Sequence, residues 1–96
     1  MFEILVIYTA KNGVCGKDFI KDLEQNGVLS AIRNENGCVK YEYYLPYEGA
    51  STILLYEIWE SPEHQRVHMT QPHMKLAMEI KQKYIDSVQL KKLSEL

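Results

Sequence analysis

The chain has 96 residues, enough for one domain of ordinary size, because globular domains commonly run to roughly 100–150 residues. Its 11 Lys and Arg against 13 Asp and Glu give a formal net charge of −2, which lacks the basic excess that nucleic-acid binding draws on. The composition is 46% hydrophobic, yet no apolar run approaches the roughly 20 residues needed to cross a bilayer. We therefore expect a single soluble domain over residues 1–96, with no nucleic-acid and no membrane partner.

The cysteines and the first residues bear on the compartment. Cys15 and Cys38 are widely spaced and have no companion pair, a pattern that supports neither a disulfide framework nor a zinc knuckle. No basic segment precedes the first apolar stretch, and no small-residue cleavage site follows it, so no export signal is visible. We expect reduced thiols and a cytoplasmic location.

The first segment, residues 2–10, alternates at the period of a strand, and both of its faces are apolar. One face carries Phe2, Ile4, Val6 and Tyr8, and the other carries Leu5 and Ile7. A strand of this kind is usually covered on two sides. Residues 11–16 contain an Asn-Gly pair and a second glycine, which indicate a loop. Residues 17–33 change to helical period, and Gly27 inside them is expected to weaken or bend the helix.

Residues 38–45 and 52–60 alternate again and predict two further strands. The connection between them, residues 46–51, has hairpin length, so the two strands are expected to pair antiparallel. A chain of this length buries only about 60–70% of the surface that its unfolded form exposes, so self-association would add stability.

Two prolines organise the next region. Ser61 offers an N-cap oxygen and Pro62 fits the first helical position, so a helix is predicted to start there. Pro72 interrupts that helix. A second helix is expected to follow, with one stripe formed by His73, Leu76, Ala77, Ile80 and Tyr84. Residues 86–93 have strand spacing with polar neighbours and predict a final edge strand.

The predicted order of strand, helix, strand, strand, helix, strand is that of a ferredoxin-like βαββαβ fold, of the α+β class. Its antiparallel sheet carries helices on one face only. The other face would keep apolar residues of the first strand, from either the set of Ile4, Val6 and Tyr8 or the set of Leu5 and Ile7. It would need a second copy of the chain to cover it. We therefore predict a homodimer through sheet faces.

The chain's three histidines, His64, His68 and His73, fall within ten residues of one another. His64 and His68 are four apart on the predicted helix, the spacing of a helical zinc pair. The local sequence does not place a third ligand, and H-E-x-x-H is absent, so we predict no metal. For His64 a solvated side chain is the favoured interpretation.

His68 follows Val67 and precedes Met69, so its imidazole is expected to point toward the sheet. A histidine with a pKa of about 6.5 can take a phenolic proton if it reaches a cavity, and a hydrogen-bonded structural role is the alternative. His73 opens a helix, where capping or packing is favoured. Trp59 would be core filler or the wall of an aromatic site. Tyrosines on the strands, Tyr43 among them, indicate sheet packing or a pocket lining.

Dedicated nucleotide sites are missing from the sequence. It contains no G-x-G-x-x-G, no P-loop and no G-x-S-x-G motif. We therefore expect no flavin, nicotinamide or other cofactor. If the protein oxidises a substrate, that substrate must supply its own electrons.

Several of these segments together resemble one family. They are GCVKYEYY over residues 37–44, LYEIWES over residues 55–61, then His68 and the run PHMK over residues 72–75. The sequence resembles the antibiotic biosynthesis monooxygenase (ABM) domain family over about residues 2–92, and its small quinol monooxygenase members most. The resemblance implies a dimeric α+β barrel with a pocket between sheet and helices. It also implies oxygenation of quinol or hydroxylated polycyclic substrates without metal, flavin or haem.

By that resemblance His68 would accept the substrate proton, Trp59 and Tyr43 would be pocket walls, and His73 would be a secondary substrate-binding or structural residue. The partners would be a small aromatic substrate and O₂. Deprotonating a phenol makes an electron-rich anion that can pass one electron to O₂, after which the radical pair recombines. The protein need only bind the aromatic, remove the proton and stabilise the anion.

Two other functions stay open, and a third is disfavoured. Haem cleavage is disfavoured, because the haem-degrading branch of this fold uses an asparagine and a histidine where this chain has Ile7 or Tyr8 and Met78. A phosphorylated-signal isomerase of the autoinducer-2 type ranks second, since no basic phosphate cradle is evident. The third is a small-ligand-binding dimer without turnover, because a fold does not guarantee activity.

Overall fold

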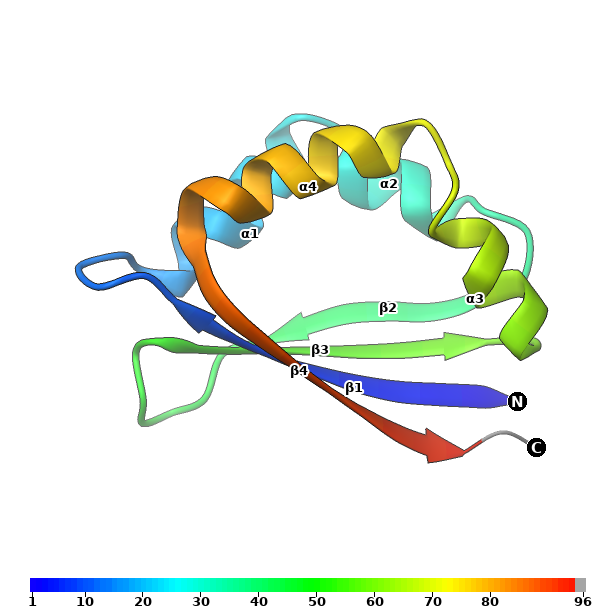
Figure 1. The fold of residues 1–96 in the computed structure, drawn as a ribbon, viewed down its shortest axis with the longest axis horizontal. Coiled ribbons are helices and arrows are strands. Elements are labelled where there is room, and N and C mark those ends of the chain that lie inside the picture. Colours follow the sequence, from blue (N-terminus) through cyan, green and yellow to red (C-terminus); the bar gives the residue numbers. More distant parts are fainter. Residues whose placement is uncertain (95–96) are drawn as a thin grey trace.

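The computed structural model describes residues 1–94 and contains four strands and four helices in this range. The strands are β1 (Phe2–Ala10), β2 (Cys38–Tyr44), β3 (Thr52–Trp59) and β4 (Ile85–Ser94). The helices are α1 (Gly16–Gln25), α2 (Val28–Arg33), α3 (Pro62–His68) and α4 (His73–Tyr84). The strands make one antiparallel sheet in the order β2-β3-β1-β4, and the helices lie over one of its faces (Figure 1). The predicted α+β, ferredoxin-like fold is confirmed.

The core lies between the sheet and the helices. β1 and β3 pair without interruption from Phe2 opposite Trp59 to Thr9 opposite Thr52, so their inward rows face the helices together. Of the two apolar faces of β1, the one with Phe2, Ile4, Val6 and Tyr8 is buried. Ile53, Leu55 and Trp59 of β3 are each 0% exposed. The same inward row of β3 also contains Glu57, which is 5% exposed. The sheet therefore carries one carboxylate into the core.

The first predicted helix is broken rather than bent. Gly27 has a left-handed φ of 75°, which ends α1 and lets α2 begin in a new direction. The turn is further held by Asn26, whose side-chain amide donates to the carbonyl of Asp22 at 2.8 Å. The sequence indicated a weak point here, and the structure shows two helices.

The inward stripe of α4 differs from the predicted one. Met74, Ala77 and Ile80 are buried, whereas Leu76 is 37% exposed, so the prediction that Leu76 faces the core was wrong. The predicted stripe with Leu76 and the observed stripe with Met74 both fit a 3.6-residue period. The direction in which the chain enters α4 after Pro72 and leaves it into β4 decides which stripe faces the core.

The opposite face of the sheet has no helix over it in the part of the chain that the structure describes (Figure 1). Leu5, Ile7 and Ile58 point to this face and are half-buried. β4 lies at the edge beside β1, as predicted, and its Val88 and Leu90 are 56% and 57% exposed. Within residues 1–94, no helix combines the length and apolar character required to cross a bilayer.

Candidate active site

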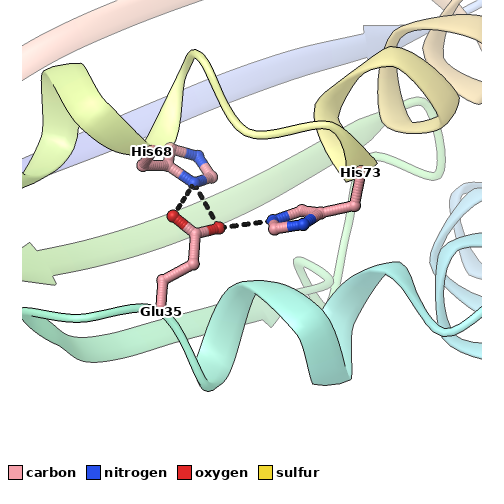
Figure 2. Close-up of side chains that lie close together, drawn as sticks. All are labelled: Glu35, His68 and His73. Atoms are coloured by element: carbon pink, nitrogen blue, oxygen red, sulfur yellow. Dashed lines mark hydrogen bonds and ion pairs between the residues drawn. The ribbon is translucent and has the colours of Figure 1, made fainter.

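A carboxylate held between two imidazole rings is the main polar cluster of the protein (Figure 2). The two Glu35 oxygens lie 3.1 and 2.9 Å from Nδ1 of His68, and Oε2 lies 2.6 Å from Nε2 of His73. The side chains of Glu35 and His68 are 8% and 2% exposed, so their contact is shielded from water, whereas His73 is 23% exposed. An ionised carboxylate can only accept hydrogen bonds, so in that state each contacting ring nitrogen carries its proton.

Short local structures bring the three residues together. Glu35 lies in the turn between α2 and β2, where its N–H donates to the carbonyl of Ile32 and its own carbonyl accepts from Cys38. His68 is the last residue of α3 and His73 is the first residue of α4. The predicted start of α3 is confirmed, because Ser61 Oγ accepts a hydrogen bond from the N–H of His64 and Pro62 is the first helical residue.

His68 points toward the sheet, as predicted, and is 1% exposed. Its ring packs on the indole of Trp59 with centroids 4.7 Å apart, and the ring of Tyr41 lies at 5.7 Å. Burial lowers the pKa of His68, although the neighbouring Glu35 opposes this. The ring is therefore neutral near pH 7, and with its proton on Nδ1 the remaining nitrogen, Nε2, can accept a proton.

A second buried carboxylate lies under α4. Trp59 Nε1 donates to Glu57 Oε1 at 2.9 Å. Burial raises the pKa of Glu57 to about 6, while the Trp59 hydrogen bond and Lys81 lower it and Glu35 raises it further. Burial also lowers the pKa of Lys81, against the attraction of Glu57. The cluster of Glu35, His68 and His73 therefore lies near a second ionisable pair.

The sequence did not single out Glu35, Glu57 or Lys81. Glu57 had a readable signal, because it falls in the alternating row of Ile53, Leu55 and Trp59. Glu35 had none, since it lies in a polar turn without period. Glu35 and the two histidines are far apart in the sequence, and only the folded chain brings these potential metal ligands together.

The predicted site residues divide into two groups. His68, His73 and Trp59 come together around Glu35. Tyr43 does not join them. It packs with Tyr8, Phe19 and Tyr41 at ring-centroid distances of 6.4, 5.9 and 5.9 Å. The link from Tyr43 to His68 runs through the ring of Tyr41.

A hollow of about 290 Å³ opens beside the cluster. It is lined by Glu35, Asn36, Glu63, His64, Val67 and Gln71. Glu35 therefore borders this hollow, but His68 and Trp59 do not, contrary to the expectation that both would face one pocket. Tyr43 borders a different depression, of about 620 Å³, together with the cations Lys17, Lys21 and Arg33.

His64 is not the freely solvated residue that was expected. It is half-buried, its Nδ1 lies 2.7 Å from Ser61 Oγ, and it forms part of the wall of the hollow. Its ring lies against Gly37, where an added Cβ would overlap the imidazole. Gly37 thus leaves the space that His64 occupies.

Residues 8–80 match the family profile described as Antibiotic biosynthesis monooxygenase, which is more than half of the chain. The chain belongs to this family. No protein among those with curated functions matches it at a significant level.

Solved structures of similar fold cover the whole domain. A Nitrosomonas europaea protein, named as a candidate antibiotic biosynthesis monooxygenase, superposes with a TM-score of 0.83 at 13% identity, covering 100% of this chain and 99% of its own. A Pseudomonas aeruginosa protein has a TM-score of 0.78 at 18% identity, with 99% and 93% covered. A Mycobacterium tuberculosis protein has a TM-score of 0.75 at 17% identity, with 99% and 94% covered. At these identities the likeness shows the fold alone.

Proposed function

We propose that this protein is a cofactor-independent monooxygenase that oxidises a quinol or hydroxylated aromatic with O₂ after removing a phenolic proton. Membership of the antibiotic biosynthesis monooxygenase family supports an oxidoreductase. The observation that carries the proposal is the Glu35 carboxylate, which borders the hollow and touches both His68 and His73.

The phenol reaches the cluster through Glu35. A hydroxyl in the hollow donates to the Glu35 carboxylate, which takes up the proton. For the proton to pass on, His68 carries its own proton on Nε2 and accepts the new one at Nδ1, the nitrogen that contacts Glu35. His68 suits this role because burial keeps it neutral, and a neutral ring can take up a proton. Trp59 stacks on His68 and holds the ring in place. In this scheme Trp59 is a positioning residue. Tyr43 contacts a substrate only if that substrate extends into the depression of about 620 Å³ that Tyr43 borders.

The chemistry draws its electrons from the substrate. The phenolate passes one electron to O₂, and superoxide recombines with the ring radical to form a carbon–oxygen bond. The resulting peroxide takes back the proton, and loss of water leaves a carbonyl. One atom of O₂ stays on the ring, the other leaves as water, and the substrate supplies all four electrons. At about 290 Å³ the hollow favours a quinol of one or two rings over a larger polycyclic.

The test is O₂ uptake with a panel of hydroquinones. We expect turnover by the wild type, and a loss of roughly 10²–10⁴-fold in kcat for Glu35→Gln and for His68→Ala, the range that a general base contributes. Lys75→Gln, exposed on the first turn of α4, is the control and should keep the wild-type rate. Absence of uptake with every quinol, together with consumption of a phosphorylated carbonyl compound, would establish the isomerase alternative instead.

The pH profile adds a second test. The base must be neutral, so kcat should fall as the pH drops through the pKa of His68, and burial sets that pKa below its ordinary value of 6.5. We therefore expect the midpoint of the acidic limb to lie below pH 6.5. A limb centred above pH 6.5 would contradict the assignment of His68 as the base.

A further inference from the structure

We propose that Glu35, His68 and His73 form a binding site for a divalent transition-metal ion, with Zn²⁺ as the preferred ion. The expectation of no metal rested on the pair of His64 and His68, for which the local sequence offered no third ligand. In the folded chain the partner of His68 is instead His73, and the third ligand comes from Glu35, more than thirty residues earlier.

The geometry suits one small ion. One ligand atom from each of the three side chains lies within 4.8 Å of the other two, in the only such grouping found among residues 1–94. A tetrahedral zinc with bonds of about 2.0–2.2 Å separates its ligand atoms by roughly 3.3 Å. The Glu35 oxygen lies 2.9 Å from His68 and 2.6 Å from His73, so these contacts need to open by roughly half an ångström.

The donor set selects the metal. Two imidazoles and one carboxylate are the ligands of open zinc sites, whereas Mg²⁺ and Ca²⁺ prefer oxygen alone. A histidine binds a metal through an unprotonated nitrogen, so each ring would carry its proton on the nitrogen opposite to the one that now contacts Glu35. Binding to neutral rings therefore requires only a change of tautomer.

Charges of both signs act around the cluster, with Glu35 and Glu57 against Lys81 and Arg33. Glu35 raises the pKa of Glu57. Burial, and then both carboxylates, raise the pKa of the nearby Cys38 thiol to about 11. Lys81 is the cation that acts on His68, and its own pKa is lowered by burial. A bound dication would relieve the repulsion between the two carboxylates.

The hollow supplies access and an open position. Glu35 forms part of its wall, so an ion can enter from that side and keep a water or a small anion as its fourth ligand. Trp59 packs against His68 on the inner side and limits the movement of its ring. The site would therefore be open on one side. Because the ion would occupy the Glu35 carboxylate and the His68 ring that act as base in the proposed oxygenase, bound zinc is expected to inhibit quinol oxidation.

Isothermal titration of the full chain with ZnCl₂ and, separately, MgCl₂ tests the proposal. We expect one zinc ion per chain and at least tenfold weaker binding of magnesium. Glu35→Gln and His73→Ala should each weaken zinc binding by at least about tenfold. His73 is the better histidine to replace, because its side chain is 23% exposed whereas that of His68 is 2% exposed and part of the core.

The control is His64→Ala, which removes the one histidine that lines the hollow and should leave zinc affinity unchanged. Circular dichroism of each variant establishes that it is folded before titration. Equal zinc affinity of wild type, Glu35→Gln and His73→Ala would overturn the site, and so would loss of binding in His64→Ala alone. Zinc titration needs no substrate, so its failure would leave the oxygenase proposal standing.

Discussion

Two buried carboxylates have different surroundings in this protein. Glu35 contacts two imidazoles, whereas Glu57 accepts a single hydrogen bond from the indole of Trp59. Because one neutral donor compensates only part of the loss of hydration, the pKa of Glu57 is raised to about 6. An ionised Glu57 at neutral pH therefore destabilises the fold.

Glu57→Gln should stabilise the protein at pH 7 by about 2 kcal/mol, since a rise from 4.5 to about 6 corresponds to that energy. The amide oxygen can still accept from Trp59. In the wild type the Glu57 carboxyl loses its proton at a lower pH in the unfolded chain than in the folded one. The contribution of Glu57 to stability is therefore highest below pH 4.5 and is lost as the pH rises through about 6. Urea unfolding of both proteins at pH 4.5 and pH 7 measures the difference, and an equal stability gap at the two values would contradict it.

At the scale of elements, α3 carries His68 into the core and His64 to the hollow, and its start depends on one serine. The helix has only seven residues, too few to be stable without a cap and tertiary contacts. Ser61 supplies that cap through its hydroxyl, which also contacts the ring of His64. The cap thus positions both the backbone and a side chain of the site wall.

Ser61→Ala should therefore lower the free energy of unfolding by about 1 kcal/mol, the usual value of a lost N-cap. Ser30→Ala, an exposed position inside α2, is a matched control and should change stability little. Chemical denaturation of the three proteins gives the comparison. An equal effect of the two substitutions would show that the cap does not stabilise α3.

Substituting two glycines at chain turns distinguishes the cost of backbone strain from the cost of side-chain overlap. Gly27 has φ 75° and Gly37 has φ 84°, so alanine is strained at both, by about 1–2 kcal/mol. A Cβ at Gly27 would meet no atom within 4 Å, whereas one at Gly37 would overlap His64. Gly37→Ala should therefore destabilise the protein more than Gly27→Ala and should shift the NMR signals of His64. A larger effect at Gly27 would contradict the packing of His64 against Gly37.

At the scale of the whole molecule, the sheet is covered on one side only within the described residues (Figure 1). Its other side exposes parts of Leu5, Ile7 and Ile58, and a chain of this size gains stability by covering such a face. We propose that two copies pair through these sheet faces, with the helices and the cluster of Glu35, His68 and His73 on the outside of the pair.

Ile58→Asp should then convert a dimer into a monomer, because two-fold symmetry places the new charge in the interface twice. Leu76→Asp, on the exposed side of α4, is the control and should leave the dimer intact. Light scattering after size-exclusion chromatography measures the mass of each protein. A monomeric wild type, or a dimer lost only in Leu76→Asp, would contradict pairing through the sheet.

The local sequence determined the order of elements. Alternation predicted β1 to its end residues, and the Ser-Pro pair at positions 61 and 62 predicted the start of α3, because strand period and capping depend on neighbouring residues alone. The antiparallel pairing of β2 and β3 followed from the short connection between them.

Only the tertiary structure decided which polar residues meet. Glu35 has no periodic neighbours, so nothing in its own turn indicates that it lies between His68 and His73. The choice of Met74 over Leu76 for the core depended on how α4 lies across the sheet. The candidate site is built from residues far apart in the chain, and their contacts depend on the packing of whole elements rather than on local propensity.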